Sequence, residues 1–190
     1  MKVLELEGTV RESVGKKATK ALRATDSVPC VLYGGNENVH FQVTNSALRK
    51  LIYTPNVYVV DLTVGDKKVK AIMKEVQFHP VKDDVLHVDF YEVTETKPIV
   101  VEIPVRLEGL AAGVRAGGKL VQDMRKLKVK GLWTNIPDVL TINVENLGLG
   151  KTTQVKDLSF ENVEIINSPN IVVAAVKLTR AARGAAAANA

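Results

Sequence analysis

Residues 57–78 read VYVVDLTVGDKKVKAIMKEVQF, and two of the predicted strands lie in this stretch. Its first part, 57–64, is rich in β-branched side chains, which favour strands. Gly65 and Asp66 then form a turn signal, and residues 69–78 continue as a second strand. A third strand is predicted at 85–93. The stretch therefore predicts consecutive strands joined by short turns.

Three more strands are predicted on the N-terminal side. Apolar and polar residues alternate over 4–10 and 39–43, as in half-buried strands, and 30–33 is a short apolar run. Two helices are predicted between them, one at 16–23 and one that follows Thr44, a good N-cap residue, up to Ile52. Six short strands with two helical inserts predict a small closed or nearly closed barrel.

The second half of the chain is also predicted to be mainly β. A boundary is expected at 94–98, because residues 94–97 include no apolar side chain before Pro98. Strands are expected at 99–107, 127–132, 139–144, 163–166 and 171–178, with a glycine-rich connection at 109–118. The predicted organisation is a barrel domain at 1–94, a β-rich domain at 98–178 and a disordered Ala-rich tail at 179–190.

Composition restricts the class of protein. Hydrophobic residues make up 46% of the 190 residues, and no apolar run approaches the ~18–20 residues of a membrane span. Residues 1–10 lack the apolar segment of a signal peptide. The single cysteine, Cys30, cannot form an internal disulfide and is predicted to be a packed core thiol. We therefore expect a cytoplasmic protein without a membrane contact.

Positive charge is concentrated in residues 11–23, RESVGKKATKALR, which contain one acid, Glu12. The cations are Arg11, Lys16, Lys17, Lys20 and Arg23. If 16–23 is helical, Lys16, Lys20 and Arg23 share one edge, called here the basic helix edge. The opposite face carries Val14, Ala18, Ala21 and Leu22. The edge is either a solvated surface or a site for a polyanion, whose binding would release counterions.

A polar hairpin face is predicted within residues 76–90. With the turn centred on Asp83, His79 would lie opposite His87 and Gln77 opposite Asp89, all on one face. A metal site there would lack a third strong ligand, and an acid–base pair would lack a nucleophile and a cleft. Mixed donors and acceptors on an open sheet suit base edges and 2′-hydroxyls in a wide RNA minor groove. A solvated polar face is the alternative.

Two further patterns involve phosphate chemistry. Residues 147–152, LGLGKT, are similar to the end of a P-loop, but the required glycine five residues before Gly150 is Glu145, so an NTPase is not expected. In a strand at 125–130, Lys126, Lys128 and Lys130 would share one face. That face is either a second phosphate-contacting strip or a solvated sheet surface.

Four motifs, taken in order, resemble one bacterial protein family. They are Gly15-Lys16 with Leu22-Arg23, Pro29 to Gly34, Val76 to Pro80, and His87 to Phe90. Their spacing resembles that of the large-subunit ribosomal proteins that bind 5S rRNA, in the two-domain general stress protein CTC form. Residues 109–118 and Ile136-Pro137 resemble the C-terminal domain of that form.

The resemblance implies a six-stranded barrel, similar to the anticodon-binding domain of glutaminyl-tRNA synthetase, and a β-rich C-terminal domain. It also implies binding to a distorted, internally paired stretch of 5S rRNA. The RNA-facing positions of the family fall on Arg11, Lys16, Lys20, Arg23, Tyr33, Gln77, His87 and Asp89. Departures from the family pattern are Lys17, Lys20, Ala21 and Phe78.

We therefore expect a non-enzymatic structural ribosomal protein that binds 5S rRNA through the basic helix edge and the polar hairpin face. Lys17 and His79 complete the predicted RNA-binding set. No catalytic residue, metal or cofactor is expected. Expected partners are 5S rRNA, the large ribosomal subunit and neighbouring ribosomal proteins, with the chain a monomer within the ribosome. The alternative is an adaptor whose basic edge docks on an acidic partner protein.

Overall fold

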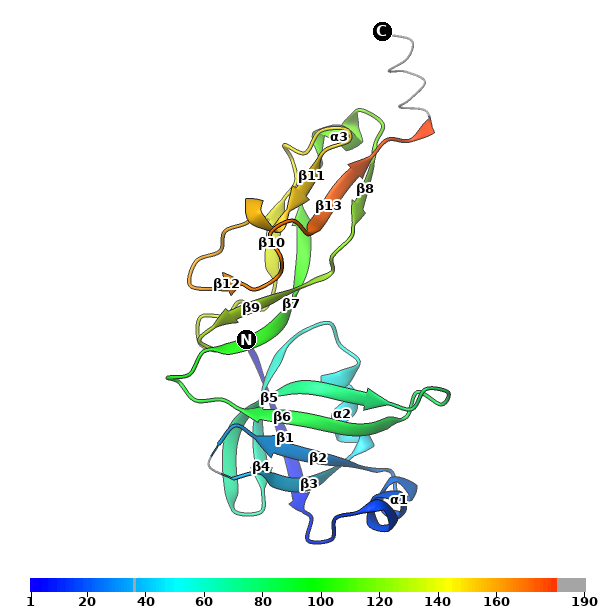
Figure 1. Ribbon diagram of the computed structural model, residues 1–190, viewed down its shortest axis with the longest axis vertical. Helices are drawn as coiled ribbons and strands as arrows, with labels where there is room; N and C mark the ends of the chain where they lie inside the picture. Colours follow the sequence, from blue (N-terminus) through cyan, green and yellow to red (C-terminus); the bar gives the residue numbers. More distant parts are fainter. Residues whose placement is uncertain (36, 181–190) are drawn as a thin grey trace. The chain divides into compact units, whose positions relative to one another are not determined.

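The computed structural model describes residues 1–35 and 37–180 (Figure 1). The chain divides into two compact units, the first formed by Met1–Ile99 with Leu132–Thr134 and the second by Val100–Gly131 with the chain from Asn135 onward. Most of the predicted Ala-rich tail, 181–190, lies outside the described residues. No helix of the described part is long and apolar enough to cross a membrane.

The first unit is a closed six-stranded barrel, as predicted from the sequence. Its strands are β1 (Lys2–Val10), β2 (Ser27–Tyr33), β3 (Val39–Thr44), β4 (Tyr58–Val64), β5 (Lys67–Phe78) and β6 (Val85–Glu92). They close in the order β1-β3-β2-β6-β5-β4. The β1–β4 and β2–β6 pairs are parallel, and the remaining pairs are antiparallel. Alternation of apolar and polar residues therefore gives the barrel an inner and an outer face.

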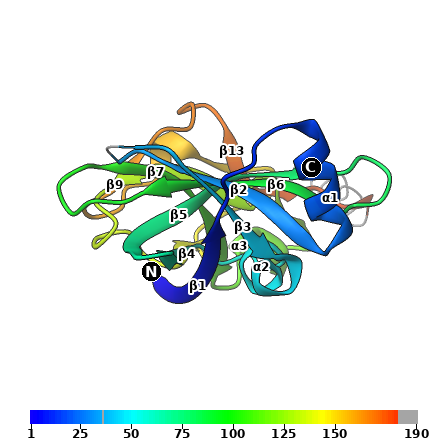
Figure 2. The ribbon, with the colours of Figure 1, turned by 90° about the horizontal axis from the view of Figure 1, so that it is seen from below.

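Two short helices are attached to this barrel. Helix α1 (Lys16–Ala24) packs against β2, and α2 (Asn45–Ile52) packs against β3 (Figures 1 and 2). Helix α2 begins after Thr44, as predicted, although the Thr44 side chain makes no capping hydrogen bond. Its Leu48 and Leu51 are buried in the barrel core, whereas α1 has no buried residue. The two helices are therefore held by different means.

Apolar side chains from all six strands form the barrel core. Leu6, Leu32, Phe41, Leu62 and Phe90 are each at most 3% exposed. Burial of each such side chain contributes about 1.5–3 kcal/mol. This core explains why the strands close into a barrel, since an open sheet would leave these apolar side chains in contact with water.

Cys30 belongs to the same core, which confirms the predicted packed thiol. It is 0% exposed, and its Sγ donates to the carbonyl oxygen of Val28 at 3.6 Å. Burial, with a smaller effect from the Asp89 carboxylate, raises the pKa of the Cys30 thiol to about 12. The thiol therefore stays protonated and unreactive at neutral pH.

Strand β2 begins earlier than the sequence indicated. The prediction placed this strand at 30–33, but it starts at Ser27 and includes Pro29. The parallel pairing of β2 with β6 begins only at Cys30. One edge of the strand is thus unpaired at the proline, a position where proline is tolerated.

The second unit is β-rich, as predicted, and consists of two small sheets. Its elements are β7 (Ile99–Glu108), α3 (Ala112–Arg115), β8 (Lys119–Gln122), β9 (Lys126–Gly131), β10 (Leu140–Asn143), β11 (Thr152–Gln154), a 3-10 turn η1 (Val155–Asp157), β12 (Glu164–Ile165) and β13 (Val172–Lys177). One sheet has the order β10-β7-β9-β12 and the other β11-β13-β8. Helix α3, β8 and β11 were not predicted.

Close packing explains the glycine-rich connection before β8. A Cβ atom on Gly113 would lie 2.6 Å from the carbonyl carbon of Gly148, and one on Gly118 would lie 2.5 Å from Cγ1 of Val176. These positions accept only glycine without movement of the backbone or of a buried side chain. The LGLGKT stretch leads into strand β11 rather than into a helix, which agrees with the absence of a P-loop.

Candidate nucleic-acid interface

Helix α1 forms where the sequence predicts it, but it is weakly buried. Alanine, leucine and lysine favour the helical conformation. Gly15 stands at the N-cap with φ +119° and gives no side-chain cap, and the first turn contains no acid. On the side predicted to be apolar, Ala18 and Leu22 are half-buried, whereas Ala21 and Val14 are exposed. The prediction of an apolar inner face is therefore right for only two of its four residues.

The lysines of α1 form a bare cationic surface. Lys16, Lys17 and Lys20 are all exposed, and none has an ion-pair partner within residues 1–35 and 37–180. Lys16 and Lys20 stand one helical turn apart on the basic helix edge. We call these two residues the lysine edge. Their charges remain available to an anionic ligand.

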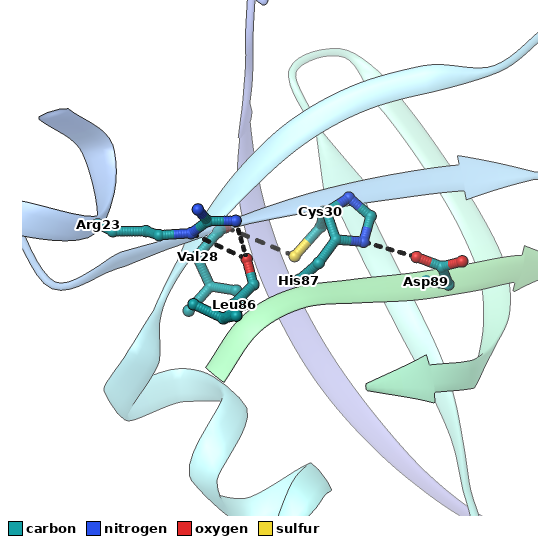
Figure 3. A network of polar contacts seen from close by, with 6 residues as sticks. All are labelled: Arg23, Val28, Cys30, Leu86, His87 and Asp89. Atoms are coloured by element: carbon teal, nitrogen blue, oxygen red, sulfur yellow. Dashed lines mark hydrogen bonds and ion pairs between the residues drawn. The ribbon is translucent and has the colours of Figure 1, made fainter. Parts of the chain in front are cut away.

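The two arginines of the basic stretch are bound to the protein itself. Nε and Nη2 of Arg23 both donate to the carbonyl oxygen of Leu86, at 3.1 and 2.8 Å (Figure 3). Nη2 of Arg11 donates to Thr19 Oγ1 and to the carbonyl oxygen of Ser13, each at 3.3 Å. Both guanidinium groups therefore take part in holding the loop and helix in place.

The predicted pairing of the β5–β6 hairpin is wrong. Gln77 lies opposite His87, and Glu75 lies opposite Asp89, so the register differs by two residues from the prediction. The cause is a register shift between Gln77 and Phe78, together with a turn in which Asp83 takes a left-handed conformation, φ +57°. Because the error is an even number of residues, Gln77, His87 and Asp89 still share one face.

His79 leaves this face and organises the turn instead. Its Nδ1 accepts hydrogen bonds from the backbone N–H groups of Val81 and Lys82, each at 3.2 Å. The backbone N–H of His79 donates to the carbonyl oxygen of Asp84 at 2.8 Å. Acceptance at Nδ1 leaves the ring proton on Nε2. The predicted opposition of His79 and His87 is therefore absent, and His79 presents a donor at the turn.

His87 and Asp89 form a close polar pair on β6. His87 Nδ1 lies 2.7 Å from Asp89 Oδ1, and the side chains are 28% and 27% exposed (Figure 3). In the neutral imidazole with its proton on Nδ1, the nitrogen that faces this carboxylate, Nε2 is an acceptor. The pair therefore offers acceptors in a fixed orientation, next to the amide of Gln77.

Glu75 was missed by the sequence analysis. It shares the face of Gln77, His87 and Asp89, and these four residues are called the polar face from here on. A carboxylate directly opposite another is unfavourable on a sheet. Had the predicted turn been centred one residue before Asp83, the pairing of Glu75 with Asp89 would have been predicted.

Within the described ranges, no group of three His, Cys, Asp or Glu side chains is arranged to hold a metal ion.

Tyr33 borders the polar face from strand β2. Its ring makes an edge contact with Tyr91, with centroids 5.7 Å apart. Burial, followed by the carboxylates of Asp89 and Glu75, raises the pKa of the Tyr33 hydroxyl. Gly34 has φ +98°, and a Cβ there would lie 2.6 Å from the Tyr91 ring, so glycine is required beside this aromatic pair.

The lysines of the second unit lie on one face of β9, as predicted. Lys126, Lys128 and Lys130 are exposed, and the residues between them are buried. Lys128 lies 3.7 Å from Glu102, and Lys130 lies 3.9 Å from Glu164. Exposed ion pairs of this kind contribute little to stability, but the glutamates would compete with a phosphate for the lysines. This strip is a poorer anion surface than α1.

Known proteins similar to this chain share both of its parts. Residues 6–90 match the Ribosomal L25p family, and residues 98–180 match the C-terminal domain of ribosomal protein TL5. The chain is 61% identical to the large ribosomal subunit protein bL25 of Bacteroides fragilis, over 99% of this chain and 98% of the relative. The corresponding protein of Bacteroides thetaiotaomicron is 60% identical over the same shares, and that of Porphyromonas gingivalis is 56% identical over 98% of both chains.

Proposed function

This chain belongs to the ribosomal L25p family, in the two-domain form, and is a structural rather than an enzymatic protein of the large ribosomal subunit; on that premise we propose that it binds 5S rRNA. The observation that carries the proposal is the presence, on one barrel, of a lysine edge with no ion-pair partner among the described residues and of a polar face of mixed donors and acceptors. The proposed RNA-binding domain is 1–94, and 98–178 is a second domain available to neighbouring ribosomal proteins.

Phosphate binding is assigned to the lysine edge and Lys17. Each cation that neutralises a phosphate releases a condensed counterion, which favours binding at low salt. Lys16 and Lys20 repel each other in the free protein, at a cost of about 0.2–0.5 kcal/mol for like charges at this spacing. A bound phosphate backbone replaces that repulsion by attraction. These residues would therefore contribute affinity without sequence preference.

Discrimination between RNAs is assigned to the polar face. Gln77 offers an amide donor and acceptor, and the His87–Asp89 pair offers acceptors at fixed positions. Exocyclic amino groups and 2′-hydroxyls in a wide, shallow minor groove supply the complementary donors. Tyr33 adds an aromatic ring and a hydroxyl at the border of this face. A face that carries Glu75 and Asp89 attracts no phosphate, so it suits base and sugar edges better.

The proposal also includes a monomeric state within the ribosome and a cytoplasmic location. The adaptor alternative, in which the basic edge docks on an acidic protein, gains no support from the three relatives described above, which are named as large-subunit proteins.

A salt titration of the full chain tests the proposal. Binding to purified 5S rRNA and to an unrelated duplex of similar length is measured between low and moderate salt. The expected result is tighter binding to 5S rRNA, with log K falling by about 0.7–0.9 per phosphate contact for each tenfold rise in salt. A folded protein that does not bind 5S rRNA at low salt would refute the proposal.

Matched double variants sharpen this titration. Lys16→Gln with Lys20→Gln should reduce the salt slope by about 1.4–1.8, because two phosphate contacts are lost. Arg49→Gln with Lys50→Gln removes the same charge from exposed positions on α2 and should leave the slope unchanged. An equal reduction of the salt slope in the two double variants would show that RNA binding depends on net charge alone, against the assignment of phosphate contacts to the lysine edge.

A further inference from the structure

Helix α1 needs an anchor that its own sequence does not provide. It has nine residues, no buried side chain and no side-chain N-cap. A helix of this length is marginal in water, and most helical stability in proteins comes from packing of an apolar face. Only Ala18, Thr19 and Leu22 are even half-buried. Polar contacts to the barrel must therefore fix its position.

A β-bulge supplies the acceptor for such a contact. Across the register shift in the β5–β6 hairpin, Gln77 pairs with His87 and Phe78 pairs with Val85. Leu86 thus has no partner residue on β5 in the register of the described strands, and the pairing of β6 with β2 starts only at Val88. Bulges leave one residue outside the ladder and redirect the neighbouring side chains. The Leu86 carbonyl oxygen points instead to α1.

Arg23 occupies this carbonyl with two of its five N–H donors. The Nε and Nη2 contacts of 3.1 and 2.8 Å link positions 63 residues apart in the chain (Figure 3). Such charge-assisted bonds are stronger than neutral ones, and a planar guanidinium forms the fork without reorganising. The residue that follows Leu86 is His87 of the polar face. The anchor therefore joins the last turn of α1 directly to that face.

We propose that Arg23 is a positioning residue: it holds α1 against β6, so that the lysine edge and the polar face form one preorganised RNA-binding surface. This inference rests on the proposed function and deepens it. The charge of Arg23 is directed at a backbone carbonyl rather than at phosphate. Preorganisation raises affinity because the helix does not have to be ordered during binding.

The first test needs no RNA. Hydrogen exchange of the α1 amides is measured in the full-length protein with Arg23→Ala, and Arg49→Ala on α2 serves as the control for loss of an exposed arginine. Loss of two charge-assisted bonds should accelerate exchange in residues 16–24 by about tenfold, with no change in α2. The control should leave α1 unchanged. Unaltered α1 exchange in Arg23→Ala overturns the proposal.

The second test separates positioning from phosphate contact. Arg23→Ala should weaken binding to 5S rRNA by about tenfold while the salt slope stays at the wild-type value, whereas Lys20→Ala lowers the slope by about 0.7–0.9. Arg23→Lys keeps the charge but has one ammonium in place of the fork, so weaker binding should persist. A reduced slope in Arg23→Ala with full recovery in Arg23→Lys overturns the proposal. If wild-type protein fails to bind 5S rRNA, the proposed function fails, and the exchange experiment still decides the anchor.

Discussion

The buried thiol of Cys30 should make the barrel less stable in alkaline solution. Its pKa is raised from 9.0 to about 12 in the folded protein. The unfolded chain therefore loses this proton first as the pH rises, and ionisation favours the unfolded state. The stabilising contribution is complete below about pH 9 and is lost progressively toward pH 12. Each pH unit within that window lowers the free energy of unfolding of the barrel by about 1.4 kcal/mol.

The comparison with Cys30→Ala isolates this effect. At pH 10, one unit above the Cys30 pKa of the unfolded chain, ionisation lowers the free energy of unfolding by about 1.4 kcal/mol. At pH 8 it lowers this free energy by less than about 0.1 kcal/mol. The stability of the wild-type barrel relative to the Cys30→Ala barrel should thus fall by about 1.3 kcal/mol between these pH values. The alanine variant carries a constant cavity cost, which cancels in the difference between the two pH values.

Urea unfolding followed at methyl signals of the barrel core by two-dimensional NMR is a suitable measurement, because it separates the barrel from the second unit. Thiol labelling gives an independent check. At pH 8 the thiolate fraction of a cysteine with a pKa of 9.0 is about one tenth, and that of Cys30, with a pKa of about 12, should be about one in ten thousand. A difference in stability that stays constant from pH 8 to 10, or labelling at the rate of an exposed thiol, would contradict the reasoning.

Three further outcomes are expected. Gly113→Ala should destabilise the second unit by about 1–3 kcal/mol, measured by thermal unfolding, because its Cβ would lie 2.6 Å from the backbone of Gly148. Gly148→Ala is the control, because its Cβ would lie 3.7 Å from the nearest atom, Cγ of Lys151, an ordinary contact distance. Phe90→Ala should cost the barrel about 3–5 kcal/mol in urea unfolding, since the ring is fully buried. Asp89→Ala should narrow the affinity gap between 5S rRNA and an unrelated duplex, whereas Lys20→Gln should weaken both similarly; parallel losses in both variants would count against the assigned roles.

The barrel could be predicted because its information is local. Alternating apolar residues define each strand, and Gly65-Asp66 defines a turn, so the number of strands follows from short windows of sequence. The buried state of Cys30 follows from its apolar neighbours in the same way. Strands β8 and β11 were missed because they are short and lie in glycine-rich segments, where pairing with β13 rather than local propensity forms them.

The details of the candidate site depended on contacts that sequence patterns do not reveal. A bulge and the left-handed Asp83 shifted the hairpin register, which removed His79 from the polar face and brought in Glu75. The contact from Arg23 to Leu86 spans 63 positions, so helical periodicity assigned Arg23 to the basic edge with no indication of its partner. Charge and face were predictable, whereas the pairing of individual groups was not.

The parallel pairs that close the barrel also determine when the chain can fold during synthesis. Strand β1 pairs with β4, and β2 pairs with β6, so each early strand waits for a partner made more than 50 residues later. Pairings of such sequence separation form slowly and late. Helix α1 is translated among the first 24 residues, yet its anchor at Leu86 exists only after almost the whole barrel has been made. A nascent chain therefore acquires its lysines early and a fixed orientation for them last.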